Sequence, residues 1–242
     1  MRTTQSPLRT LRFAASVALV CSLFVTTAVY WLRPIQAAYG ALEYNRVIVA
    51  AAGLIPPDAA LSDRDVVSRF LELETRIVDL ELDWYTDAVD PLTYDYRPLA
   101  ATRERPRYMP VYLLEQLGRL DRVVLPIYGR GMWSTIHGVI TLAGDLTTVV
   151  GVVFHEHGET PGIGDRIEDA AWLAQWRGKR LYTDSGELMF AIGAAGRDAS
   201  FRVDGITGAT VTVSAVAAMI DDWFGPDGYG PYLAALRGGR DR

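Results

Sequence analysis

A long apolar run without charges near the N-terminus constrains this chain most strongly. The run extends from Phe13 to Leu32, and about 20 such residues form a helix long enough to cross the hydrocarbon core of a bilayer. Tyr30 and Trp31 lie at its C-terminal end, where amphipathic aromatic rings favour the membrane–water interface. The sequence therefore predicts a single transmembrane helix over residues 13–32.

The arginines that precede this run predict its orientation. Arg2, Arg9 and Arg12 lie within residues 1–12, which contain no acidic residue. Because positive charges stay on the cytoplasmic side of a membrane-spanning helix, we expect residues 1–12 to be cytoplasmic. The main domain is then expected in the periplasm, on a protein anchored in a bacterial inner membrane.

A cleaved signal peptide and a lipoprotein anchor are the two alternatives to this uncleaved helix. A signal peptide has an apolar core of roughly 7–15 residues and a small-residue cleavage site. The run here is longer, and the nearest candidate site, around Gln36–Ala38, is a poor match. A lipoprotein cysteine would lie at the end of the run, whereas Cys21 lies in its middle.

Charge and cysteine content exclude several classes of function. Four of the 24 basic residues and none of the 29 acidic residues lie within the first 33 positions. The rest of the chain is therefore strongly acidic, which makes it a poor match for the phosphate backbone of nucleic acids. Cys21 is the only cysteine, which excludes an internal disulfide framework and an iron–sulfur cluster held by this chain's own cysteines.

Hydrophobic patterning predicts an α+β protein. Apolar spacing typical of helices extends over Ile35–Trp84, with a second helix beginning at Ser62. We expect a helical neck and linker over residues 33–105. The following segment changes to short strands separated by glycines, namely VYLLEQL, RVVLPIY, HGVITLA and TTVVGVVFHEH. These strands predict an antiparallel-sheet domain over residues 106–242.

The segment Asp204–Thr212, DGITGATVT, leads into a predicted helix from about Thr210 to Phe224. The first turn of a helix offers unpaired N–H groups and a positive dipole end, which together bind anions such as phosphate. Thr210 presents a hydroxyl at this point. A threonine near a helix start is also a common N-cap, so the segment alone leaves both interpretations open.

The segment His155–Gly164, HEHGETPGIG, is predicted to be a strand end that runs into a glycine-rich turn. Its two histidines and scattered acids do not complete a metal-ligand set, so we expect no metal site. An exposed charge cluster at Glu156 and Glu159 is the alternative to a binding site.

The segment Gly129–Gly138, GRGMWSTIHG, places a tryptophan after a Gly-x-Gly turn. Trp133 in such a position is commonly a core aromatic residue. The two glycines do not form a dinucleotide-binding fingerprint, because the third glycine, the following helix and the βαβ frame are missing.

Together, the three segments resemble the signatures of the covalent FMN-binding domain family. In that family the threonine after Gly-Ala forms a phosphoester with FMN, which implies that Thr210, rather than Thr207 or Thr212, carries FMN here. A threonine hydroxyl is a weak nucleophile without activation. In this family a separate flavin transferase, which uses FAD as the donor and works outside the cytoplasmic membrane, forms the bond.

The resemblance implies that all three segments contribute cofactor-binding residues. These are Thr210, Thr207, Gly208, Ala209, Thr212 and Asp204 in the first segment, Glu159, Thr160, Gly162, Ile163 and Gly164 in the second, and Trp133 and Ser134 in the third. Ile163 departs from the family pattern, in which leucine is usual. No catalytic side chain is implied, because the flavin performs the redox chemistry.

Two membrane respiratory complexes contain members of this family, the Na+-translocating NADH:quinone oxidoreductase and the Rnf electron-transport complex. Four stretches resemble the member found in the former, namely AAAGL at Ala50–Leu54, Pro110–Thr135, HGETPGIG and Trp223–Gly239. The resemblance implies electron transfer between partner subunits while NADH is oxidised by ubiquinone and sodium is exported. No NADH site is identifiable, so we expect no activity from this chain alone.

Two alternatives remain at this stage. One is the related flavoprotein of the Rnf complex, which would use the same cofactor chemistry. The other is a flavin-free extracytoplasmic assembly module, in which Thr210 is only a helix cap.

Overall fold

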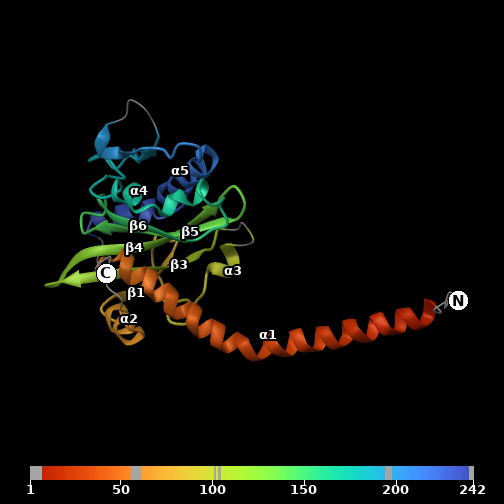
Figure 1. Cartoon of the computed structure of the whole chain (residues 1–242). Coiled ribbons are helices and arrows are strands. Elements are labelled where there is room, and N and C mark those ends of the chain that lie inside the picture. Colours follow the sequence, from red (N-terminus) through yellow and green to blue (C-terminus); the bar gives the residue numbers. More distant parts are fainter. Residues whose placement is uncertain (1–6, 56–60, 101, 103–104, 194–197, 240–242) are drawn as a thin grey trace. The chain divides into compact units, whose positions relative to one another are not determined.

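The computed structural model of the protein describes residues 7–55, 61–100, 102, 105–193 and 198–239. The chain forms two compact units, Met1–Tyr44 and Asn45–Arg242 (Figure 1). The second unit therefore includes most of the segment predicted to be a neck.

The first element is one long helix, α1, which extends from Pro7 to Ala51. Its portion Leu8–Arg33 is apolar and long enough to cross a membrane, as the uncharged run predicted. No residue in the most apolar window of this portion is buried within the protein, and large side chains such as Phe24 are exposed. A contiguous apolar surface of this kind suits lipid and is unfavourable in water.

The segment after α1 begins with the second helix that the sequence predicted. α2 (Asp63–Phe70) starts after the N-cap residue Ser62, and the Ser62 and Asp65 side chains form a reciprocal capping box. A short helix, α3 (Arg97–Ala100), follows within the proline-rich connection.

Between α2 and α3 the chain forms strands where a helix was predicted. β1 is Glu74–Asp79 and β2 is Trp84–Tyr85. β1 pairs along its whole length with β3 (Tyr108–Gln116), and its Ile77 and Val78 are buried. The helical prediction is wrong here because pairing with a strand distant in the sequence overrides the local apolar pattern.

A six-stranded sheet forms the centre of the second unit, with strand order β2-β1-β3-β4-β5-β6. β4 (Arg119–Arg130), β5 (Thr135–Ala143) and β6 (Val149–Glu156) continue the antiparallel order from β3. The predicted α+β class with an antiparallel sheet is therefore confirmed. β5 is buried at every position except its ends, which explains its almost uninterrupted run of apolar residues.

Shorter elements and two further helices complete the unit. They are η1 (Gly164–Glu168), α4 (Ala170–Ala174), β7 (Ala191–Ile192), η2 (Ala199–Phe201), β8 (Arg202–Val203), α5 (Thr210–Phe224) and α6 (Gly230–Arg237). α5 has the bounds that the sequence predicted. It packs directly on β4, since a Cβ atom at Gly129 would lie only 2.9 Å from the Met219 Cβ.

The C-terminal end of α1 is closed by a Schellman motif. Gly53 has a φ of 70°, its N–H donates to the Ala50 carbonyl at 2.9 Å, and the Leu54 N–H donates to the Val49 carbonyl at 3.1 Å. Glycine fits this position because the left-handed conformation is strained for residues with a Cβ.

The same helix end is hydrogen-bonded to the sheet. The hydroxyl of Thr141, a fully buried residue of β5, donates to the Ala51 carbonyl at 2.8 Å, and the Arg122 guanidinium donates to the Ala52 carbonyl. Ile48 and Val49 are also completely buried. The last turn of α1 is therefore part of the core of the second unit.

Replacing Thr141 by valine tests this attachment. Because the buried Ala51 carbonyl loses its partner, we expect the free energy of unfolding to fall by about 1–3 kcal/mol in denaturant titrations. Thr75→Val in β1 is the matched control, since the half-buried Thr75 hydroxyl makes no hydrogen bond to the described residues. A loss equal to that of the control would contradict the assignment.

Candidate functional site

A buried glutamate brings the three sequence segments together at the start of α5. Oε1 of Glu159 accepts hydrogen bonds from the backbone N–H groups of Met132 (2.9 Å) and Trp133 (3.2 Å). Oε2 accepts a hydrogen bond from the Thr212 hydroxyl at 2.5 Å. Glu159 is only 5% exposed, so its carboxylate is used entirely within the protein.

Close backbone packing around this carboxylate requires glycine. A Cβ atom at Gly164 would lie 2.8 Å from the Thr212 hydroxyl and 2.9 Å from the Glu159 Cβ, and one at Gly131 would lie within 2.8 Å of Ile136. These contacts explain why glycines recur at the junction of the three segments.

The turn after Glu159 is formed around the Thr160 carbonyl. That carbonyl accepts hydrogen bonds from Ile163 (3.1 Å) and Gly164 (2.9 Å), and Gly162 has a φ of 76°, as the third residue of a type II turn requires. The turn leaves Ile163 47% exposed.

Thr210 lies at the first position of α5. The N-cap residue is Ala209, which has no side chain able to cap, and Gly208 before it has a φ of 86°. Thr210 is exposed, and its hydroxyl makes no hydrogen bond to any residue in the described ranges. The interpretation of Thr210 as a simple N-cap is therefore wrong.

The remaining residues of the first segment differ in exposure. Thr207 is exposed, whereas Thr212 is buried against Glu159. The backbone of Asp204 is held by Trp172, whose Nε1 donates to the Asp204 carbonyl at 2.7 Å, and by Gln175, which accepts from the Asp204 N–H at 3.0 Å. The loop that precedes Thr210 is therefore fixed at its start.

Trp133 is a surface residue and not the core aromatic residue that such a position commonly holds. Its side chain is 68% exposed, and its Nε1 donates to the Thr160 hydroxyl at 3.0 Å. Ser134 is also exposed, and a Cβ at Gly158 would lie 2.8 Å from its hydroxyl. The segments that follow β4 and β6 therefore meet at the surface as well as beneath it.

An apolar rim surrounds the start of α5. We define it as Met132, Trp133, Ile163 and Val211, all of which are more than 45% exposed. Sequence analysis did not select Met132 and Val211, although each is adjacent to a selected residue. Exposed apolar side chains gathered around polar groups are typical of a ligand site.

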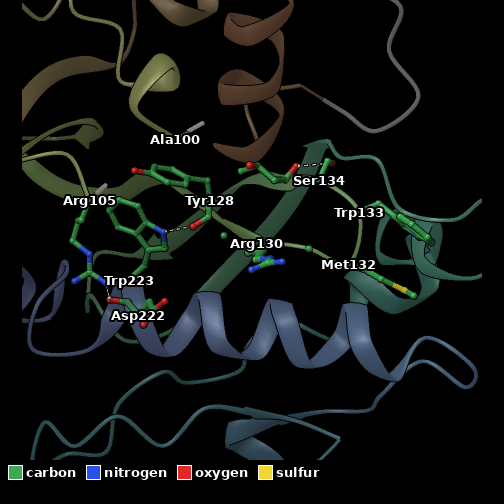
Figure 2. Close-up of a pocket in the computed structure, with 12 residues that line it drawn as sticks. Ala100, Arg105, Tyr128, Arg130, Met132, Trp133, Ser134, Asp222 and Trp223 are labelled. Carbon is green, nitrogen blue, oxygen red and sulfur yellow. Dashed lines mark hydrogen bonds between the residues drawn. The ribbon is translucent and has the colours of Figure 1, made fainter. Parts of the chain in front are cut away.

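A cleft of about 450 Å³ opens beside the rim (Figure 2). It lies between the end of β4, the start of β5 and the last turn of α5. Its principal lining side chains are Ala100, Arg105, Tyr128, Arg130, Met132, Trp133, Ser134, Thr135, Asp222 and Trp223. Sequence analysis missed Arg105, Arg130 and Asp222, because their separation in the chain gives no local signal.

The three histidines of the chain lie next to this region. The His137 and His155 rings are 6.2 Å apart, and burial lowers the pKa of His155 to about 4, with a further contribution from His137. Burial also lowers the pKa of His137. His157 lies beyond β6, and its Nε2 is 3.0 Å from a Glu168 carboxylate oxygen. The described residues contain no group of three or more His, Cys, Asp or Glu side chains suited to a metal ion.

Comparison with known proteins places these features in a family context. Residues 131–225 match the FMN-binding domain family, and this span includes Trp133, Glu159 and Thr210. The NqrC protein of the Na(+)-translocating NADH-quinone reductase from Pseudomonas aeruginosa is 39% identical over 99% of this chain and 99% of its own length. Its counterpart from Yersinia pestis is 33% identical over 96% of this chain and 93% of its own length.

Solved structures agree with these relatives. The crystal structure of Shewanella oneidensis NqrC has a TM-score of 0.69 to this chain at 29% sequence identity, and the match covers 81% of this chain and 97% of that one.

Removing the Glu159 carboxylate tests its role in the site. Glu159→Ala leaves two backbone N–H groups and the Thr212 hydroxyl without their buried acceptor, so we expect a loss of about 3 kcal/mol or more in the free energy of unfolding. Glu159→Gln keeps one acceptor oxygen and should lose less. Glu156→Ala at the exposed end of β6 is the control, and an equal effect there would refute the assignment.

The histidine pair predicts a pH dependence of stability. Because the pKa of His155 is lowered from 6.5 to about 4 in the folded protein, the unfolded state binds more protons between these values. The free energy of unfolding should therefore fall as the pH drops from 6.5 towards 4, by up to about 1.4 kcal/mol per unit. His155→Gln should show a shallower fall over this range in denaturant titrations, and an unchanged slope would exclude the effect.

Proposed function

We propose a function for this chain from the premise that it belongs to the NqrC family of the Na(+)-translocating NADH-quinone reductase, which its full-length relatives establish. We propose that it is a membrane-anchored flavoprotein of that complex and holds FMN covalently, through a phosphoester to Thr210. The observation that carries the proposal is the exposed, unbonded Thr210 hydroxyl at the start of α5, within the span that matches the FMN-binding domain family.

The residues at the start of α5 fit a phosphate group. The first N–H groups of a helix have no partner within the helix, and the positive end of the helix dipole favours a phosphodiester charge. Gly208 and Ala209 leave this point uncrowded, since nothing lies within 4 Å of a Cβ placed on Gly208. Thr210 would thus hold the phosphate where its negative charge is stabilised.

The other candidate residues divide into two roles under this proposal. Glu159 and Thr212 are buried and bonded to each other, so they would position the site without touching the cofactor. The exposed residues would contact it directly, and these are Thr207, Thr160, Gly162, Ile163, Trp133 and Ser134. Gly164, Ala209 and Asp204 would shape the backbone beneath it.

Bound FMN would supply the redox chemistry of the protein. The chain would hold the flavin so that electrons pass between neighbouring subunits of a complex that oxidises NADH, reduces ubiquinone and exports sodium. The covalent bond would prevent loss of the cofactor on the periplasmic side of the inner membrane. The chain alone would not oxidise NADH.

A flavin transferase would be needed to modify Thr210. The reaction would join the Thr210 oxygen to the FMN moiety of FAD and release AMP, with the hydroxyl proton lost to a base. The exposure of Thr210 on the folded surface supports modification of the folded domain.

Membership of the NqrC family decides between the two respiratory complexes in favour of the sodium-translocating reductase. The flavin-free assembly module is the remaining rival, and cofactor attachment distinguishes it.

Thr210→Ala tests the attachment point. In the full chain, co-expressed with a flavin transferase, we expect a mass increase of about 440 Da on the peptide that contains Thr210 and its complete loss in the variant, because the bond is covalent. Thr207→Ala, at an exposed threonine in the same loop, should keep the adduct. An unmodified wild-type chain would support the flavin-free module.

A further inference from the structure

The cleft beside the apolar rim has aromatic walls that are held in place. The Trp223 Nε1 donates to the Tyr128 carbonyl at 2.6 Å, and the two rings meet edge to face with centroids 5.1 Å apart. Trp133 closes the opposite end of the cleft from its exposed position. Figure 2 shows these residues around one hollow beside α5. Such walls suit a planar aromatic ligand.

Two arginines line this cleft, and they differ in their surroundings. Arg105 donates to the Asp222 carbonyl at 3.0 Å and lies 5.7 Å from the Trp223 ring centroid. Arg130, by contrast, makes no hydrogen bond or ion pair with any residue that the structure describes. A guanidinium left without a partner in a ligand-sized cleft is suited to bind a planar anionic group.

The position of Arg130 relates the cleft to the start of α5. Its neighbour Gly129 packs on Met219, and its other neighbour, Gly131, lies against Glu159, which bonds Thr212. From Thr210 to Met219 the helix rises by about 14 Å. Arg130 therefore lies alongside the first half of α5, within reach of a flavin mononucleotide whose phosphate is on Thr210.

We propose that this cleft receives the isoalloxazine ring of the flavin at Thr210 and that Arg130 stabilises the negative charge that the ring gains on reduction. The inference rests on the proposed function and adds a ring-binding site and an electrostatic role that attachment alone does not require. Reduction adds two electrons and one proton to the ring at neutral pH, and the remaining charge lies on its pyrimidine edge, where a cation raises the reduction potential.

The test compares Arg130→Gln and Arg130→Lys with wild type in the full, flavinylated chain. Spectroelectrochemical titration should show a more negative midpoint potential in Arg130→Gln, because the reduced form loses its counter-charge, and a value near wild type in Arg130→Lys. Arg119→Gln removes the same charge from the opposite end of β4, about 36 Å away along an extended strand, and should leave the potential unchanged.

Intact mass separates the possible failures. If wild type and Arg130→Gln both carry the adduct and have the same potential, the role of Arg130 is refuted while the proposed function stands. If Arg130→Gln loses the adduct that wild type keeps, Arg130 serves attachment and the inference is also wrong. If wild type carries no adduct, both the inference and the proposed function fail.

Flavin fluorescence provides an independent readout of the ring position. A ring against Trp133 should be quenched, so Trp133→Leu should increase the fluorescence per attached flavin, whereas Trp84→Leu in β2 should not. Equal fluorescence in wild type and Trp133→Leu would place the ring elsewhere.

Discussion

A single buried carboxylate holds the functional surface of this protein together. An isolated buried charge is costly, and Glu159 is tolerated because two backbone N–H groups and one hydroxyl donate to it. Those donors come from the loop after β4 and from the first turn of α5, whereas Glu159 itself follows β6. Since each partner satisfies the others, the three segments depend on one another for their positions.

The rigidity beneath the surface contrasts with what is left exposed above it. Trp133, Ile163 and Val211 remain uncovered although such side chains normally stabilise a core. The Thr210 hydroxyl and the Arg130 guanidinium are without partners among the described residues. Local rules of burial and pairing are broken together around one well-supported point, which is the pattern expected of a binding site.

The membrane-spanning part and the sheet domain meet within one helix. α1 carries the apolar length at its N-terminal end, and its last turn is buried and hydrogen-bonded to β4 and β5 through Arg122 and Thr141. The helix is therefore ended by a specific motif at Gly53 and not by a flexible linker. This attachment makes the stability of the domain depend on residues that the sequence alone assigned to a neck.

The sequence by itself determined the membrane-spanning length, the strands of the sheet, the bounds of α5 and the segments that meet at Thr210, because each is a local pattern of hydrophobicity, glycine or turn residues. It predicted the wrong structure for β1 and β2, whose pairing depends on a distant strand. Only the tertiary structure decided that Glu159 and Thr212 are buried partners, that Trp133 is exposed, and that Arg105, Arg130 and Trp223 line one cleft. Those properties arise from contacts between residues far apart in the chain, and no local pattern encodes them.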